Sequence, residues 1–182
     1  MVATGLFSEL FRFNLAYLAR TLDGVSADKF FIRPEGRGNP LIWLLGHIVL
    51  NRGEIVELLG GDPSTRNLGD LFARGTKPSS DPSIYPPPQQ LMTRFMKLSS
   101  TTDHLLKHVS ESLLNQSSWG QFESVGQHLA YSYMHETHHI GQVTYVVNLP
   151  AFKTKRAGSS EHRKDSTTKI VLDSIRSVFS QT

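Results

Sequence analysis

The chain has 182 residues, of which 38% are hydrophobic and 19% charged, a composition that fits one globular domain and excludes an intrinsically disordered chain. It contains no cysteine, which excludes disulfide scaffolds, thiolate zinc sites, iron–sulfur clusters and cysteine nucleophiles. The net charge of +3 arises in residues 151–182, where seven basic residues against three acidic ones give +4, whereas residues 1–150 carry −1. No apolar run is long enough to span a bilayer and no signal peptide is recognisable, so we expect a soluble, cytoplasmic protein without a membrane partner.

The first two predicted helices cover residues 5–22 and about 39–61. Apolar residues recur at helical spacing in the first of them. The second begins at Asn39-Pro40, where we expect asparagine as the N-cap and proline as the first helical residue. It ends at Gly60-Gly61, a typical helix terminator.

The third predicted helix opens after Pro88 and carries a narrow apolar stripe as far as residue 109. The fourth runs from about Ser124 to Leu149 and is stopped by Pro150. Strand-like alternation is absent, so the predicted fold class is all-α. We divide the chain into a four-helix domain, 1–150, and a basic C-terminal extension, 151–182, in which residues 170–179 are a candidate fifth helix.

The connection between the second and third predicted helices is unusually long. It extends from Gly61 to Pro88, or 28 residues, far beyond the usual helix–helix loop. Antiparallel neighbours need only a short loop, whereas a parallel pair needs a connection that returns along the bundle. The sequence therefore predicts that these two helices run parallel.

Three histidines in two predicted helices suggest a metal site. His135 and His139 stand four residues apart, so their side chains lie on one face of the fourth helix. A third ligand has to come from another helix, and His47 lies in the middle of the otherwise apolar second helix. Together they predict a three-histidine site for a divalent transition metal, with zinc and nickel as the first candidates.

The remaining histidines are expected to have other roles. His138 lies one residue off the ligand face and is not predicted to be a ligand. His128, two turns before His135, is expected to be a pocket residue. His104 and His108 flank the apolar stripe of the third helix, which favours a surface position for both.

Several further side chains are expected near the metal. Asn51 and Glu54 lie one and two turns beyond His47, and either could orient a ligand imidazole. In a closed, structural version of the site, Glu54 would itself be the fourth ligand. The other residues that we expect to shape the pocket are Asn14, Trp43, Tyr131 and Gln142.

Two segments resemble the DinB/YfiT-like family of metal-binding four-helix bundles. The run from Asn39 to Ile48, NPLIWLLGHI, resembles the family's helix-two histidine motif. The run from His135 to Gln142, HETHHIGQ, resembles its helix-four His-x-x-x-His-x-Gly-Gln signature. The resemblance covers roughly residues 5–150. It implies metal ligation by His47, His135 and His139 with water completing the coordination sphere, parallel second and third helices, and a homodimer.

The resemblance implies two reaction types on small-molecule substrates. Similar proteins include transferases and isomerases that use low-molecular-weight thiols such as mycothiol or bacillithiol, and others assigned as hydrolases. A metal with an open coordination position suits both, because it can activate a thiol or a water. No motif reads nucleic-acid bases, and the basic extension is interpreted as a solvated terminus rather than a nucleic-acid site.

Two alternatives stay open. The segment His135-Glu-Thr-His-His139 matches the zincin motif H-E-x-x-H, in which Glu136 would be the general base. The metzincin extension of that motif fails, because Gln142 and Tyr145 stand where glycine and histidine are required. The second alternative is a non-catalytic bundle whose metal site is structural or sensory, or which serves as an interaction protein.

Overall fold

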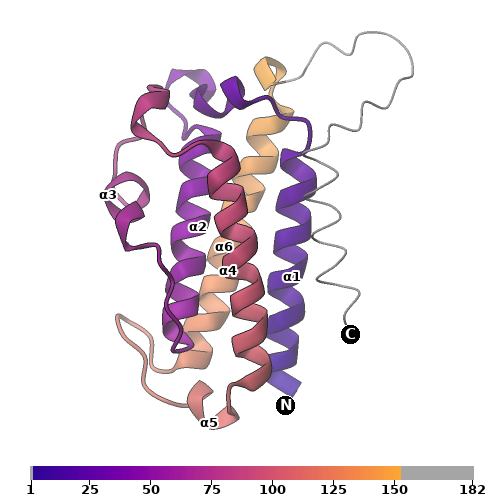
Figure 1. Ribbon diagram of the computed structural model, residues 1–182, viewed down its shortest axis with the longest axis vertical. Helices are drawn as coiled ribbons and strands as arrows, with labels where there is room; N and C mark the ends of the chain where they lie inside the picture. The colour runs from indigo at the N-terminus through magenta and orange to yellow at the C-terminus, as the bar shows by residue number, and fades with distance from the viewer. Residues whose placement is uncertain (1, 153–182) are drawn as a thin grey trace, which may run out of the picture.

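The computed structural model describes residues 2–152, and every regular element in that range is helical. Four long helices form a bundle: α1 (Val2–Leu22), α2 (Leu41–Leu58), α4 (Pro88–His108) and α6 (Val125–Asn148) (Figure 1). The all-α prediction is therefore confirmed. The candidate helix at 170–179 and most of the basic extension lie outside the described residues. Among the described helices, none has both the length and the apolar character that a membrane span requires.

The helices are arranged as the long connection predicts. α1 and α2 each pack against both α4 and α6. α2 and α4 run in the same direction, and α1 and α6 run in the opposite one (Figure 1). The connection from α2 to α4 returns along the bundle and carries the short helix α3 (Gly69–Phe72) on its way. The remaining short elements are α5 (Glu111–Leu114) and the 3-10 helices Ala27–Phe31, Pro34–Gly36, Arg66–Leu68, Pro82–Ile84 and Pro150–Phe152.

Local sequence signals explain most helix ends, with one correction. α6 starts as predicted, because the side chain of Ser124 accepts the backbone N–H of Gln127 at 3.1 Å. α2 starts one residue later than predicted, since Pro40 rather than Asn39 occupies the N-cap position. Pro40 has an extended ψ of 157°, so its ring stays outside the helix while its carbonyl accepts the first helical N–H groups.

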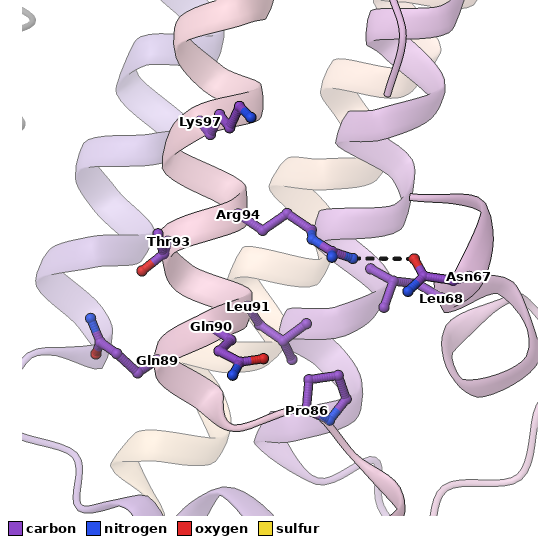
Figure 2. Close-up of a pocket in the computed structure, with 9 residues that line it drawn as sticks. All are labelled: Asn67, Leu68, Pro86, Gln89, Gln90, Leu91, Thr93, Arg94 and Lys97. Carbon is purple, nitrogen blue, oxygen red and sulfur yellow. Dashed lines mark hydrogen bonds between the residues drawn. The ribbon is translucent and has the colours of Figure 1, made fainter. Parts of the chain in front are cut away.

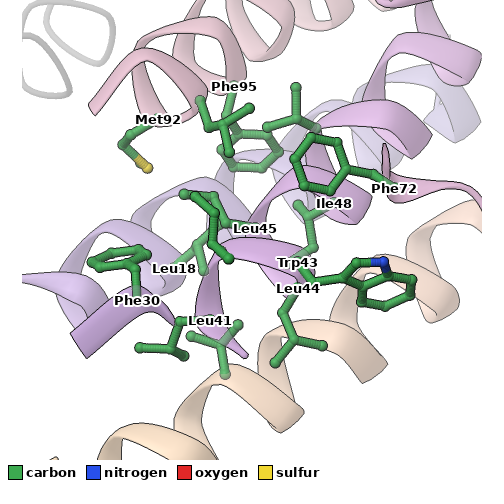
Figure 3. Close-up of a cluster of buried hydrophobic side chains, with 14 of the residues drawn as sticks. Leu18, Phe30, Leu41, Trp43, Leu44, Leu45, Ile48, Phe72, Met92 and Phe95 are labelled. Atoms are coloured by element: carbon green, nitrogen blue, oxygen red, sulfur yellow. The ribbon is translucent and has the colours of Figure 1, made fainter. Parts of the chain in front are cut away.

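The crossover connection packs directly onto α2. Phe72, at the end of α3, is fully buried in the main core cluster beside α2 (Figure 3). A Cβ atom at Gly46 would lie 2.2 Å from the Phe72 ring, and one at Gly53 would lie 2.1 Å from the Thr65 hydroxyl. Glycine at these two positions of α2 therefore lets the connection approach the helix backbone. As a result α2 is covered by α4, by α6 and by the connection, which fits its being the most apolar of the four long helices.

Candidate metal centre

The structure brings the three predicted histidines together. His47 comes from the middle of α2, and His135 and His139 from successive turns of α6. The three possible ligand atoms, one ring nitrogen from each histidine, all lie within 4.8 Å of one another. The Nε2 atoms of His135 and His139 are 3.1 Å apart. No other histidine, aspartate or glutamate within residues 2–152 joins this cluster.

The crossover connection orients His47. The Nδ1–H of His47 donates to the backbone carbonyl of Phe72 at 2.6 Å, which leaves Nε2 with a free lone pair. Trp43, one turn earlier, stacks on the same imidazole with ring centroids 4.8 Å apart. The indole N–H of Trp43 donates in turn to the Thr76 hydroxyl at 2.8 Å. Phe72 and Thr76 of the crossover connection therefore fix the rings of His47 and Trp43.

Side chains of α6 orient the other two imidazoles. Gln142 Oε1 lies 2.8 Å from Nδ1 of His139, and Gln142 Nε2 lies 3.2 Å from Nε2 of His138. The amide thus accepts from His139 and donates to His138, which leaves Nε2 of His139 as the unprotonated nitrogen, facing Nε2 of His135. Tyr131 lies one turn before His135, and the two rings are nearly parallel with centroids 5.7 Å apart.

The electrostatics keep the three imidazoles neutral. Burial, together with the other imidazoles, lowers the pKa of both His135 and His139 to about 4. The positive charge of Arg74 also lowers the pKa of His135. Burial lowers the pKa of His47, and its hydrogen bond to Phe72 opposes this only in part. A neutral imidazole is the form that binds metal, so the donor set fits a divalent transition metal without loss of protons.

Two of the residues expected around the site have other partners, and a third lies outside the cluster. Asn51 donates to the backbone carbonyl of His47 at 2.8 Å and not to its ring, so the predicted role of orienting the imidazole belongs to Phe72. Glu54 is exposed and lies outside the cluster, which overturns the closed site with Glu54 as fourth ligand. Asn14 is buried and donates to Glu136 at 2.9 Å, away from the histidine ligand atoms.

The other histidines differ in their surroundings. His128 is buried, and its ring stacks on that of Phe122 with centroids 4.1 Å apart. Ser118 lies 2.8 Å from Nδ1 of His128, so this histidine attaches the segment before α6 to the helix. His104 and His108 are exposed on α4, as predicted.

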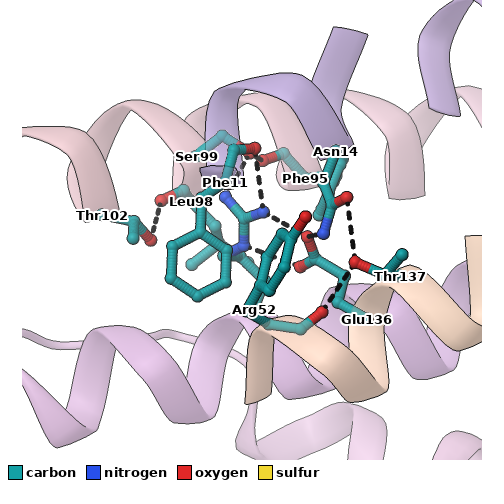
Figure 4. Close-up of polar contacts among 10 residues, drawn as sticks. Phe11, Asn14, Arg52, Phe95, Leu98, Ser99, Thr102, Glu136 and Thr137 are labelled. Atoms are coloured by element: carbon teal, nitrogen blue, oxygen red, sulfur yellow. Dashed lines mark hydrogen bonds and ion pairs between the residues drawn. The ribbon is translucent and has the colours of Figure 1, made fainter. Parts of the chain in front are cut away.

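A buried ion pair at the centre of the bundle was not predicted. Arg52 and Glu136 are both fully buried and form two hydrogen bonds, with Nε–Oε2 at 2.8 Å and Nη2–Oε1 at 2.5 Å (Figure 4). Ser99 accepts from Arg52 at 2.9 Å, and the carbonyl of Phe11 lies 3.4 Å from Nη2. With Asn14 from α1, the network joins all four long helices.

This ion pair overturns the zincin alternative. In that mechanism Glu136 would have to face the metal and a water as the general base. Here Glu136 lies on the core side of α6 and both its oxygens are engaged by Arg52. Its carboxylate is therefore structural.

A cavity of about 460 Å³ lies elsewhere, between the crossover connection and the first turns of α4 (Figure 2). Arg94 donates to Asn67 across it at 3.3 Å. None of the three histidines lines this cavity, which separates it from the candidate metal centre. Its other lining residues are Leu68, Pro86, Gln89, Gln90, Leu91, Thr93 and Lys97.

Comparison with known proteins agrees with the fold. The family model described as DinB superfamily matches residues 10–143, which span α1 to α6 and include all three histidines. No curated protein matches the chain.

Proposed function

The chain belongs to the DinB superfamily, and we propose that it binds one divalent transition metal through His47, His135 and His139. We further propose that the metal serves catalysis on a small molecule, in a transferase that uses a low-molecular-weight thiol or in a hydrolase that uses water. Zinc and nickel are the first candidates for the metal.

The observation that carries this proposal is the fixed orientation of two of the rings. Nδ1 of His47 is engaged by the Phe72 carbonyl and Nδ1 of His139 by the Gln142 amide. Each ring therefore presents Nε2, and each has the acceptor on its far nitrogen that metal-binding histidines generally have. A purely structural role would not require three neutral imidazoles with one ring nitrogen of each within 4.8 Å of the others.

The number of ligands supports chemistry rather than structure. Structural zinc sites use four protein ligands, whereas catalytic sites use three and keep one position open. Within residues 2–152 the cluster has three members and no carboxylate. A divalent metal held there supplies Lewis acidity, which lowers the pKa of a thiol or water bound at the open position.

The charge around the cluster suits an anionic ligand. Arg74, on the crossover connection, is exposed and forms no ion pair with another described residue. Its charge acts on His135. A thiolate, or a substrate with an anionic group, is stabilised by this nearby cation. The carboxylate closest to the histidines in sequence, Glu136, is neutralised by Arg52.

We also propose that the protein acts as a homodimer. Large apolar side chains stay exposed on two helices that pack against each other: Leu6, Phe13 and Tyr17 on α1, and Met134 and Tyr145 on α6. A second copy would cover such a face. Sedimentation equilibrium of the wild type and Phe13→Asp measures this, and a monomeric wild type would contradict it.

Cobalt substitution tests the proposed chemistry. The protein is loaded with Co²⁺ and its absorption spectrum is recorded during titration with 2-mercaptoethanol at neutral pH. Growth of a thiolate-to-cobalt charge-transfer band supports the thiol-dependent transferase. Visible bands that shift with pH but not with thiol support the hydrolase. Bands that respond to neither indicate a closed coordination sphere and favour the non-catalytic alternative. His139→Ala is the control, since it removes one ligand.

A further inference from the structure

A row of aromatic rings leads away from the three-histidine cluster. The Tyr131 ring lies nearly parallel to that of His135, with centroids 5.7 Å apart. Phe122, from the segment that precedes α6, follows at 5.0 Å from Tyr131. Beyond it, the ring of His128 stacks on Phe122 and meets the edge of Trp119 at 5.3 Å. The row therefore joins the candidate metal centre to the segment 115–124.

The row is fixed without a ligand. His128, on α6, contacts the segment twice: its ring stacks on Phe122 at an interplanar angle of 23°, and it forms a hydrogen bond with Ser118. The backbone N–H of Val125 donates to the carbonyl of Gln116 at 2.9 Å, which closes the segment against α6. Rings held in this way cost little additional entropy when a ligand covers them.

Parts of the row remain open to solvent. Trp119 is 51% exposed and Tyr131 is 39% exposed, although both belong to a packed aromatic row. The hydroxyl of Tyr131 forms no hydrogen bond with any described residue. Aromatic faces beside a polar or metal-binding centre are the usual composition of a small-molecule site.

We propose that Phe122 and the exposed part of Tyr131 form a subsite for a planar aromatic or conjugated group of the substrate, next to the metal at His47, His135 and His139. This inference rests on the proposed function, because it places the polar end of the ligand on the metal. A flat ring that covers the exposed part of Tyr131 gains aromatic packing energy beyond the area that it buries, in an offset or edge-to-face arrangement. A branched aliphatic group cannot stack in this way.

Two hydroxamates test the subsite, because they share one metal-binding group and differ in the rest of the molecule. Acetohydroxamate carries a methyl group and benzohydroxamate a phenyl ring. Their dissociation constants for the zinc-loaded protein are measured by isothermal titration calorimetry. We expect benzohydroxamate to bind about tenfold tighter than acetohydroxamate, the scale of one well-placed aromatic contact.

Variants locate the preference. In Tyr131→Ala the ratio of the two dissociation constants is expected to fall to about two. Tyr131 also packs beside the ligand His135, but any effect on the metal acts on both probes and cancels in the ratio. Tyr131→Phe keeps the ring and should keep the ratio. Trp119→Ala is the matched control and should keep the ratio, since Trp119 is also exposed, at 51%, and meets the row at His128, its far end from the metal.

The outcomes separate this inference from the proposed function. Equal affinity for both hydroxamates in the wild type overturns the subsite and leaves the open metal centre standing. A preference for benzohydroxamate that survives in Tyr131→Ala, or that Trp119→Ala abolishes to the same extent, overturns the assignment to Tyr131 and Phe122. Failure of the zinc-loaded protein to bind either probe overturns the open metal centre and, with it, the subsite.

Discussion

The backbone carbonyl of Phe72 accepts the Nδ1–H of His47 at 2.6 Å, so a residue of the crossover connection sets the direction of an imidazole on α2. The same residue packs its ring against Gly46, one position before His47. The long connection is therefore part of the candidate metal centre, in addition to joining two parallel helices.

Gly46→Ala should disturb both packing and the metal centre. The added methyl group would lie 2.2 Å from the Phe72 ring, so the connection has to move and its carbonyl moves away from His47. We expect a loss of about 1–3 kcal/mol in the free energy of unfolding, together with weaker metal binding. Urea unfolding of the apoprotein and metal competition titrations measure the two effects.

Gly141→Ala is the matched control for that substitution. Gly141 also lies inside a long helix, and a Cβ there meets nothing within 4 Å. Alanine should therefore stabilise α6 by about 0.5–1 kcal/mol through its helix propensity. Equal destabilisation by the two substitutions would contradict the role of Gly46 as a contact point for Phe72.

Removal of one partner of the buried Arg52–Glu136 pair should cost more stability than removal of both. Glu136→Leu leaves the Arg52 charge buried without its partner and should cost about 3–5 kcal/mol in the free energy of unfolding. The double variant Arg52→Met/Glu136→Leu should recover most of that loss, because no unpaired charge remains. Chemical denaturation of the wild type, Arg52→Met, Glu136→Leu and the double variant gives the coupling energy. A double variant as unstable as Glu136→Leu would contradict this account.

Gln142 should act on metal affinity through His139. Removing an acceptor on the far nitrogen of a ligand histidine typically weakens metal binding by about 10–100-fold. We expect a loss of that size in Gln142→Ala, with the fold unchanged, in a competition titration against a chromogenic chelator. His108→Ala changes an exposed histidine on α4 and should have no effect. Wild-type affinity in Gln142→Ala would show that the hydrogen bond to His139 is unimportant.

The lowered pKa values predict how the apoprotein responds to acid. His135 and His139 have a pKa of about 4 in the folded state, below the usual value of 6.5. Between these values the unfolded chain binds more protons than the folded one, so stability falls as the pH drops from 6.5 towards 4. Urea midpoints of the apoprotein across this range should fall more steeply in the wild type than in His135→Ala/His139→Ala. Parallel pH dependence in the two proteins would contradict the neutral, buried state of these histidines.

The sequence could predict what depends on spacing within one helix. The pair His135 and His139 follows from the helical repeat, and His47 is conspicuous because its neighbours are apolar. The parallel arrangement of α2 and α4 follows from the length of the connection between them. These predictions needed no knowledge of tertiary contacts beyond the packing of two helices.

Contacts between distant segments could not be predicted in the same way. Nothing in the local sequence of the connection indicates that the Phe72 carbonyl meets His47, although two glycines seven residues apart on α2 mark the face that it approaches. Arg52 carried a signal that was missed, since it lies four residues from both Ile48 and Val56 on the buried face. Its partner Glu136 directly follows His135. A helix that directs His135 toward the metal directs the next residue to a different face, and on α6 that face is the core.

The most direct test of the metal centre is the metal content of the purified protein. Tag-free protein, prepared without chelators, is analysed for transition metals beside His47→Ala and the surface control His108→Ala. We predict about one equivalent of a divalent transition metal per chain in the wild type and in His108→Ala, and none in His47→Ala, because that variant keeps only the two ligands of α6. Wild-type protein that takes up no metal even after reconstitution, or His47→Ala that retains a full equivalent, would contradict the three-histidine site.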